Sequence, residues 1–191
     1  GYKGIWRIHQ GNINMTIAIA RRNPYIVGSA ISEPKLFFGR KKLLQFVEDN
    51  LKQGERVILL HGQRRIGKSS VLLQIPNFVE SDHFVFIPFD LQDKLHLTLN
   101  NTLHALSKAI LRSLDLELDH VKLSGEEGLA SDPSIFSQNF LPEIYRLLGE
   151  KNIVLLLDEF DVLNSRDPIT ATPTFSHYLQ SLLNQHQKLF I

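Results

Sequence analysis

The sequence contains no cysteine, and this absence removes three kinds of chemistry at once. Without a thiol, the 191-residue chain can form no disulfide, no zinc–thiolate site and no cysteine nucleophile. The sequence also lacks any apolar run near the ~20 residues that a membrane-spanning helix needs, and it shows no signal peptide. These properties fit a reducing compartment, and we expect a cytoplasmic protein without a membrane partner.

Charge of one sign is not in excess either. The chain has 21 Lys and Arg against 20 Asp and Glu, so its net charge at pH 7 is +1. Nucleic acid is possible as a partner, but this balance does not indicate it. The eight histidines show no H-E-x-x-H or similar ligand spacing, and no G-x-S-x-G nucleophile elbow occurs. A hydrophobic fraction of 43% indicates an ordinary globular protein.

Residues 62–69, Gly-Gln-Arg-Arg-Ile-Gly-Lys-Ser, fit the phosphate-binding pattern G-x-x-x-x-G-K-[ST]. The apolar run at 56–61 predicts a buried strand before this loop. Helical spacing follows the loop as far as Pro76, where we expect the helix to stop. A chance match in a glycine-containing turn is the alternative interpretation, and the flanking strand and helix argue against it.

Each residue type in this loop has a chemical reason. The two glycines let backbone N–H groups turn toward an anion at the positive end of the following helix. The Lys68 side chain supplies a charge for the β- and γ-phosphates, and the Ser69 hydroxyl is a ligand for Mg²⁺. The expected nucleotide contacts are Gly62, Gln63, Arg64, Arg65, Ile66, Gly67, Lys68, Ser69 and Ser70. Two interpretations of Arg64 and Arg65 have equal weight. These side chains either contact phosphate or a neighbouring domain, or they are simply solvated.

A second part of the site is predicted where an aliphatic run ends in Asp158 and Glu159. Five aliphatic residues in succession predict a central parallel strand that is buried on both faces. Ligands bind at the carboxyl ends of such strands. We expect Asp158 to hold Mg²⁺ together with Ser69, and Glu159 to polarise the attacking water, with Lys68 as the second catalytic residue. Solvated charges at a strand end are the alternative.

The remaining patterns alternate between strands and helices. Amphipathic helices are predicted from Lys41 to Gly54, at 95–114, from Asp132 to Gly149 and at 174–187, and strands at 83–90 and from Lys188 onward. Pro88 predicts that the strand at 83–90 lies at the edge of its sheet or ends there. The order is typical of an α/β fold with a parallel sheet.

Two stretches together resemble the STAND and related AAA+-like branch of the P-loop ATPases, which belongs to the ASCE class. They are residues 62–70 and Leu155-Leu-Leu-Asp-Glu-Phe-Asp161. In addition, Phe38-Gly39-Arg40 is similar to the entry segment of those proteins, and Phe89-Asp90-Leu91-Gln92 after the second strand also resembles them. The resemblance covers residues 23–191 and implies a three-layer α/β P-loop fold of the additional-strand type. We therefore assign 23–191 as an ATPase core and 1–22 as an N-terminal extension or linker.

The resemblance also implies that residues 25–28 and 38–40 run beside the adenine, which adds Val27, Gly39 and Arg40 to the nucleotide contacts. It implies a polar sensor residue at the end of the strand from Lys188, then a fifth strand and a lid, and none of these is in the sequence. We therefore expect an incomplete core from a larger protein, with a poorly paired P-loop strand.

Function follows from the resemblance as an expectation. It implies adenine nucleotide (ATP or ADP) and Mg²⁺ as ligands. The predicted helix at 174–187 has no arginine, and Arg166 is the nearest candidate for an arginine finger. This disfavours a ring ATPase and favours a slow nucleotide switch in a signalling or defence-type protein, which self-associates or binds partner domains. The alternatives are a DNA-linked ATPase of the origin-recognition or transposition-regulator type and a nucleotide-binding scaffold without turnover.

Overall fold

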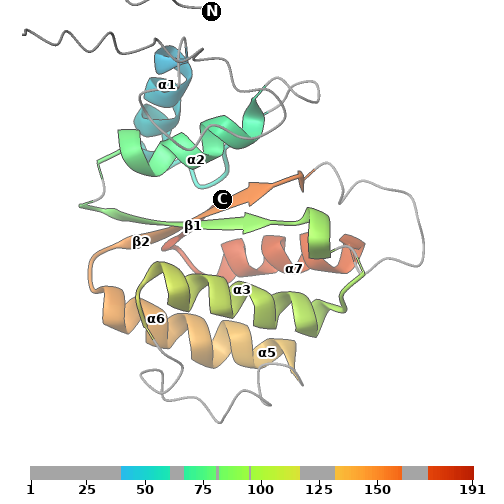
Figure 1. Cartoon of the computed structure of the whole chain (residues 1–191). Helices are drawn as coiled ribbons and strands as arrows, with labels where there is room; N and C mark the ends of the chain where they lie inside the picture. The colour runs from blue at the N-terminus through green and yellow to red at the C-terminus, as the bar shows by residue number, and fades with distance from the viewer. Residues whose placement is uncertain (1–39, 61–66, 81, 95, 117–131, 161–171) are drawn as a thin grey trace, which may run out of the picture.

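The computed structural model describes residues 40–60, 67–80, 82–94, 96–116, 132–160 and 172–191 of the chain. In this part, a parallel sheet lies between two layers of helices (Figure 1). The predictions for residues 1–22, for Val27 and Gly39 and for loop residues 62–66 fall outside the described residues. The architecture is the three-layer α/β arrangement that was predicted for a P-loop fold.

The sheet has the strand order β1-β2-β3, and all pairs are parallel. Its strands are β1 (Phe84–Asp90), β2 (Asn152–Asp158) and β3 (Leu189–Phe190). The aliphatic run of β2 is almost completely buried between helices on both sides, which confirms the predicted central strand. Among the described strands β1 lies at the edge, as Pro88 predicted, because proline has no N–H to donate to a further strand.

The segment at 56–60, directly before the phosphate loop, extends the sheet on its other side. The Ile191 N–H donates to the Arg56 carbonyl at 2.8 Å, and the Ile58 N–H donates to the Ile191 carbonyl at 2.9 Å. This is the hydrogen-bond pattern of parallel neighbours. The segment therefore runs beside β3, and β3 lies between it and β2, which is the order of the additional-strand type.

The prediction that this segment is a buried strand is nevertheless wrong. Residues 56–60 do not form a regular strand, and the side chains of Val57 and Leu59 are 58% and 70% exposed. The described backbone partners of the segment, on Ile191 beside β3, reach only as far as Ile58. Beyond that point, no described backbone pairs with the segment.

Two helices cover one face of the sheet. They are α1 (Lys41–Lys52), at its predicted place, and α2 (Lys68–Phe78). The prediction that α2 stops at Pro76 is wrong, because the Val79 N–H still donates to the Ile75 carbonyl at 2.9 Å. Proline disturbs the helix through its missing N–H and its ring, but the turn that follows still forms here and contains the buried Val79.

The other face is covered by α3 (Leu99–Ser113), α7 (Thr172–Gln185) and a long helical run. Helix α3 begins later than predicted because the Thr98 Oγ1 caps it, accepting the Asn101 N–H at 3.3 Å. A short 3₁₀ turn, η2 (Gln92–Lys94), precedes it. None of the described helices is long and apolar enough to cross a membrane.

The helical run consists of α5 (Pro133–Ile135), a π-helical turn η4 (Phe136–Phe140) and α6 (Leu141–Leu148). The turn widens just before Pro142, where the Leu141 N–H donates to the carbonyl of Phe136, five residues back. A proline at this position lacks the N–H of the regular helix and crowds the preceding turn, which explains the local widening.

Side chains alternate between the two faces of the sheet and so divide the core into two clusters. Val154 and Leu156 of β2 pack with Phe84 of β1 beneath α1 and α2. Ile153 and Leu155 pack beneath α3, α6 and α7. The same alternation decides which face the residues at the carboxyl ends of the strands share.

Candidate functional site

The first component of the site is the start of α2. Gly67 precedes the helix with φ +88° and ψ +29°, a left-handed conformation that is costly for residues with a side chain. This geometry explains why the loop ends in glycine. The first turn of α2 contains no acidic residue and no side-chain cap, so the positive end of the helix is not neutralised from within the helix. Lys68 and Ser69 are half-buried and Ser70 is buried.

The second component is the carboxyl end of β2. Asp158 is the last residue of the strand, and its Oδ1 accepts the backbone N–H of Glu159 at 2.9 Å. Glu159 has φ +54°, which is uncommon for a residue other than glycine. Phe160 packs against the core beneath, and this contact anchors the turn. Such local strain concentrates at functional sites.

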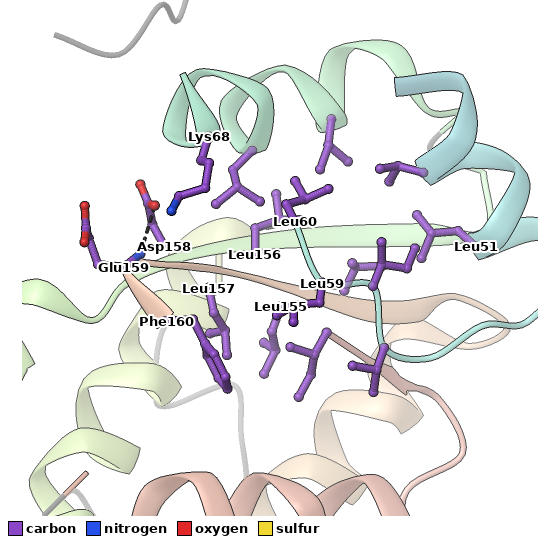
Figure 2. A pocket seen from close by; sticks show the side chains of 17 residues that line it. Leu51, Leu59, Leu60, Lys68, Leu155, Leu156, Leu157, Asp158, Glu159 and Phe160 are labelled. Atoms are coloured by element: carbon purple, nitrogen blue, oxygen red, sulfur yellow. Dashed lines mark hydrogen bonds between the residues drawn. The ribbon is translucent and has the colours of Figure 1, made fainter. Parts of the chain in front are cut away.

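The two components meet in one cavity of about 150 Å³. Figure 2 shows the side chain of Lys68 turned toward the carboxylate of Asp158, with the Glu159 carboxylate alongside. These three residues form the charged end of the cavity. Its remainder is apolar and is lined by α1, α2, β2 and the segment 57–60. The arrangement provides a cation, two carboxylates and a helix N-terminus within one recess.

Of the two predicted magnesium ligands, Asp158 lines the cavity, whereas Ser69, half-buried in the first turn of α2, is not among the lining residues. The Ser69 hydroxyl and the Asp158 carboxylate are hard oxygen donors, which Mg²⁺ prefers. Within the described residues, no cluster of three or more His, Cys, Asp and Glu could hold a metal by itself. A site of this kind suits Mg²⁺, which keeps several waters and takes one or two protein oxygens together with phosphate oxygens.

Arg40 lies apart from this cavity. It precedes α1, and its carbonyl accepts the N–H groups of Leu43 and Leu44, both at 3.1 Å. With Lys41, Lys42 and Leu43 it lines a separate surface depression. The contact of Arg40 with adenine therefore stays a prediction, as do the contacts of Val27, Gly39 and residues 62–66.

One acidic residue near the site was not among the predicted site residues. Asp90 is the last residue of β1 and lies in register with Asp158. The signal was present in the sequence, because Asp90, like Asp158, ends an apolar strand. The stretch 89–92 is part of the family resemblance, but no role is assigned to Asp90 there, since neither strand alone shows that Asp90 lies beside Asp158.

The fold and the site geometry define a P-loop NTPase of the additional-strand type. A family model described as an AAA domain matches residues 49–191. Since this is well over half of the chain, the protein belongs to that family, whose members are P-loop ATPases with an adenine nucleotide site. Searches of the curated proteins and of the solved structures found no match.

Proposed function

We propose that this AAA domain binds and slowly hydrolyses ATP in a Mg²⁺-dependent manner, and that it acts as a conformational or oligomerisation switch of the STAND type. Such a switch belongs to a multidomain signalling or defence-type protein. The observation that carries the proposal is the common cavity of Lys68, Asp158 and Glu159, which come from two elements 90 residues apart in sequence. The family match supports the nucleotide, and the switch goes beyond that match.

Each side chain has a role that its chemistry allows. Lys68 and the first amides of α2 hold the phosphates through charge and hydrogen bonds. Ser69 and Asp158 hold the metal, and Glu159 orients and deprotonates the attacking water. When it is bound, Mg²⁺ neutralises charge on the phosphate oxygens during transfer.

The test is equilibrium binding of ATP and ADP to the chain in excess Mg²⁺. Lys68→Ala removes the cation that faces the phosphates, and we expect at least a tenfold loss of affinity, because charge-assisted hydrogen bonds contribute about 1.5–3 kcal/mol. The matched control is Lys151→Ala, since Lys151 is exposed at the opposite end of β2. Equal affinities of wild type, Lys68→Ala and Lys151→Ala would contradict the proposed site.

The switch is tested separately by the state of assembly. A switch requires that ATP and ADP stabilise different conformations or assemblies, because a ligand shifts an equilibrium only by its differential affinity. Size-exclusion chromatography with light scattering is run with ATP, ADP and no nucleotide at matched protein concentrations. Identical mass and elution in the three conditions, with nucleotide bound, would leave ATP binding in place and reject the switch.

A further inference from the structure

Asp90 and Asp158 form the last pair of the β1–β2 ladder. The ladder continues past them, because the Leu91 N–H donates to the Asp158 carbonyl at 3.2 Å. Neighbouring strands run about 4.8 Å apart. The backbone therefore holds these two aspartates side by side at the carboxyl edge of the sheet.

Both side chains belong to the same face of the sheet. Paired residues in parallel strands share a face, and alternate residues return to it. On β2 the face of Asp158 is that of Val154 and Leu156, which pack beneath α1 and α2. On β1 the face of Asp90 is that of Phe84 and Phe86, in the same cluster. Asp90 thus lies on the face over which α2 carries Lys68.

The carboxylate of Asp90 is oriented from one side. Its Oδ1 accepts the Gln92 N–H at 2.8 Å, and the side chain is exposed. Asp158 is held in a similar way by the Glu159 N–H. Both carboxylates carry negative charge at the same edge and face of the sheet, so a cation, or the water shell of a cation, placed there is attracted by both.

From these relationships we propose that Asp90 is a positioning residue for magnesium, which holds through water the hydration shell of the ion that Asp158 faces. The inference rests on the proposed nucleotide function and names a further residue for the same site. Mg²⁺ dehydrates reluctantly and keeps several waters, so a carboxylate one strand away binds it through those waters. Partners of this kind typically change metal affinity by about 10–100-fold.

The experiment uses Mn²⁺ as a paramagnetic probe, titrated into the chain with saturating ADP, and free Mn²⁺ is measured by EPR. Asp90→Asn keeps a side-chain oxygen for the Gln92 N–H and removes the charge. We expect it to raise the dissociation constant of Mn²⁺ about tenfold, while the affinity for ADP in EDTA does not fall. If Asp90 had only a structural role, Asp90→Asn would change the affinity for Mn²⁺ and the affinity for ADP together.

The matched control is Asp132→Asn. Asp132 accepts the Ser134 N–H at 2.8 Å, also two residues ahead, but lies in the run that covers the opposite face of the sheet. Equal Mn²⁺ affinity for Asp90→Asn, Asp132→Asn and wild type, with Asp158→Asn weaker, would overturn the role of Asp90 alone. Absence of ADP binding by the wild type, with and without Mn²⁺, would overturn the proposed function and this inference together.

Discussion

The backbone N–H of Glu159 donates to the Oδ1 of Asp158 at 2.9 Å, and Glu159 itself adopts φ +54°. The two acids are neighbours in sequence, but the turn between them ends the strand and separates their roles. Asp158 keeps the side-chain direction set by β2, whereas Glu159 leaves the ladder in a left-handed conformation. The unfavourable backbone geometry costs on the order of 1 kcal/mol or more.

Glu159→Gln is predicted to abolish turnover and spare binding. Glutamine keeps the size and a hydrogen-bonding oxygen, but it cannot take a proton from the attacking water. We expect phosphate release to fall at least about 100-fold, because general bases contribute roughly 10²–10⁴-fold. ATP affinity in Mg²⁺ should stay within about threefold of wild type. Phosphate release and nucleotide binding are measured on the same preparations.

Glu150→Gln is the control, because Glu150 is exposed just before the opposite end of β2. It should leave both readouts unchanged. Equal phosphate release by wild type and Glu159→Gln would instead favour a nucleotide-binding scaffold without turnover.

Asp115→Gly is predicted to stabilise the fold. Asp115 follows α3 with φ +54°, and the Leu116 N–H closes the helix end by donating to the Leu111 carbonyl at 2.9 Å. Glycine adopts this conformation without strain, and the change also removes a negative charge from the negative end of a helix. We expect the free energy of unfolding to rise by about 0.5–1 kcal/mol in urea titrations. If Asp115→Ala gains as much as Asp115→Gly, charge and not backbone conformation is the cause.

The sequence predicted the central strand and most of the helices because their signals are local. The aliphatic run before Asp158 could only be a strand buried on both faces, and the stripe of leucines in α3 could only face a core. The two wrong predictions are the buried strand at 56–60 and the end of α2 at Pro76. Residues 56–60 have a good strand composition, but within the described residues their backbone bonds to Ile191 only at Arg56 and Ile58.

The candidate site divides in the same way. Lys68 and Asp158 could be paired from their motifs alone, and both line one cavity in the structure. Asp90 could not be assigned, because its position beside Asp158 depends on the register of β1 with β2. Register is set by packing across the sheet and cannot be derived from the sequence of either strand alone.

Acidification is predicted to destabilise the fold through His186. Burial lowers the pKa of His186 below its usual 6.5, its Nε2 has no hydrogen-bond partner in the described residues, and its ring lies 5.6 Å from that of Tyr145. The unfolded chain therefore takes up the proton first as the pH falls below about 6.5. The stability that the neutral His186 contributes to the fold is fully present above that pH, and it is lost as the pH falls through the lower pKa that His186 has in the folded state.

The measurement is the melting temperature between pH 7.5 and pH 5. Its decrease should be smaller in His186→Phe, which keeps a ring beside Tyr145 but cannot titrate. His96→Phe serves as the control, because His96 is exposed. The same slope in wild type and His186→Phe would contradict the assignment to His186.

Arg56→Met is predicted to weaken the attachment of the segment 56–60 to α7. The Arg56 guanidinium donates to the carbonyls of Leu183 and His186, at 2.5 and 3.2 Å, where α7 ends. A cation at the negative end of a helix and charged hydrogen bonds to its last carbonyls both stabilise it. Methionine keeps much of the apolar stem, so the loss reports mainly on the guanidinium, and we expect about 2 kcal/mol in urea titrations.

Arg112→Met is the matched control, since Arg112 is exposed in the last turn of α3, and it should cost no more than about 0.5 kcal/mol. Amide hydrogen exchange distinguishes a local from a global effect of Arg56→Met. Faster exchange should appear first at the Ile58 and Ile191 amides, because their hydrogen bonds flank Arg56. Unchanged exchange there, with equal stability of both variants, would show that the guanidinium does not hold this end of the sheet against α7.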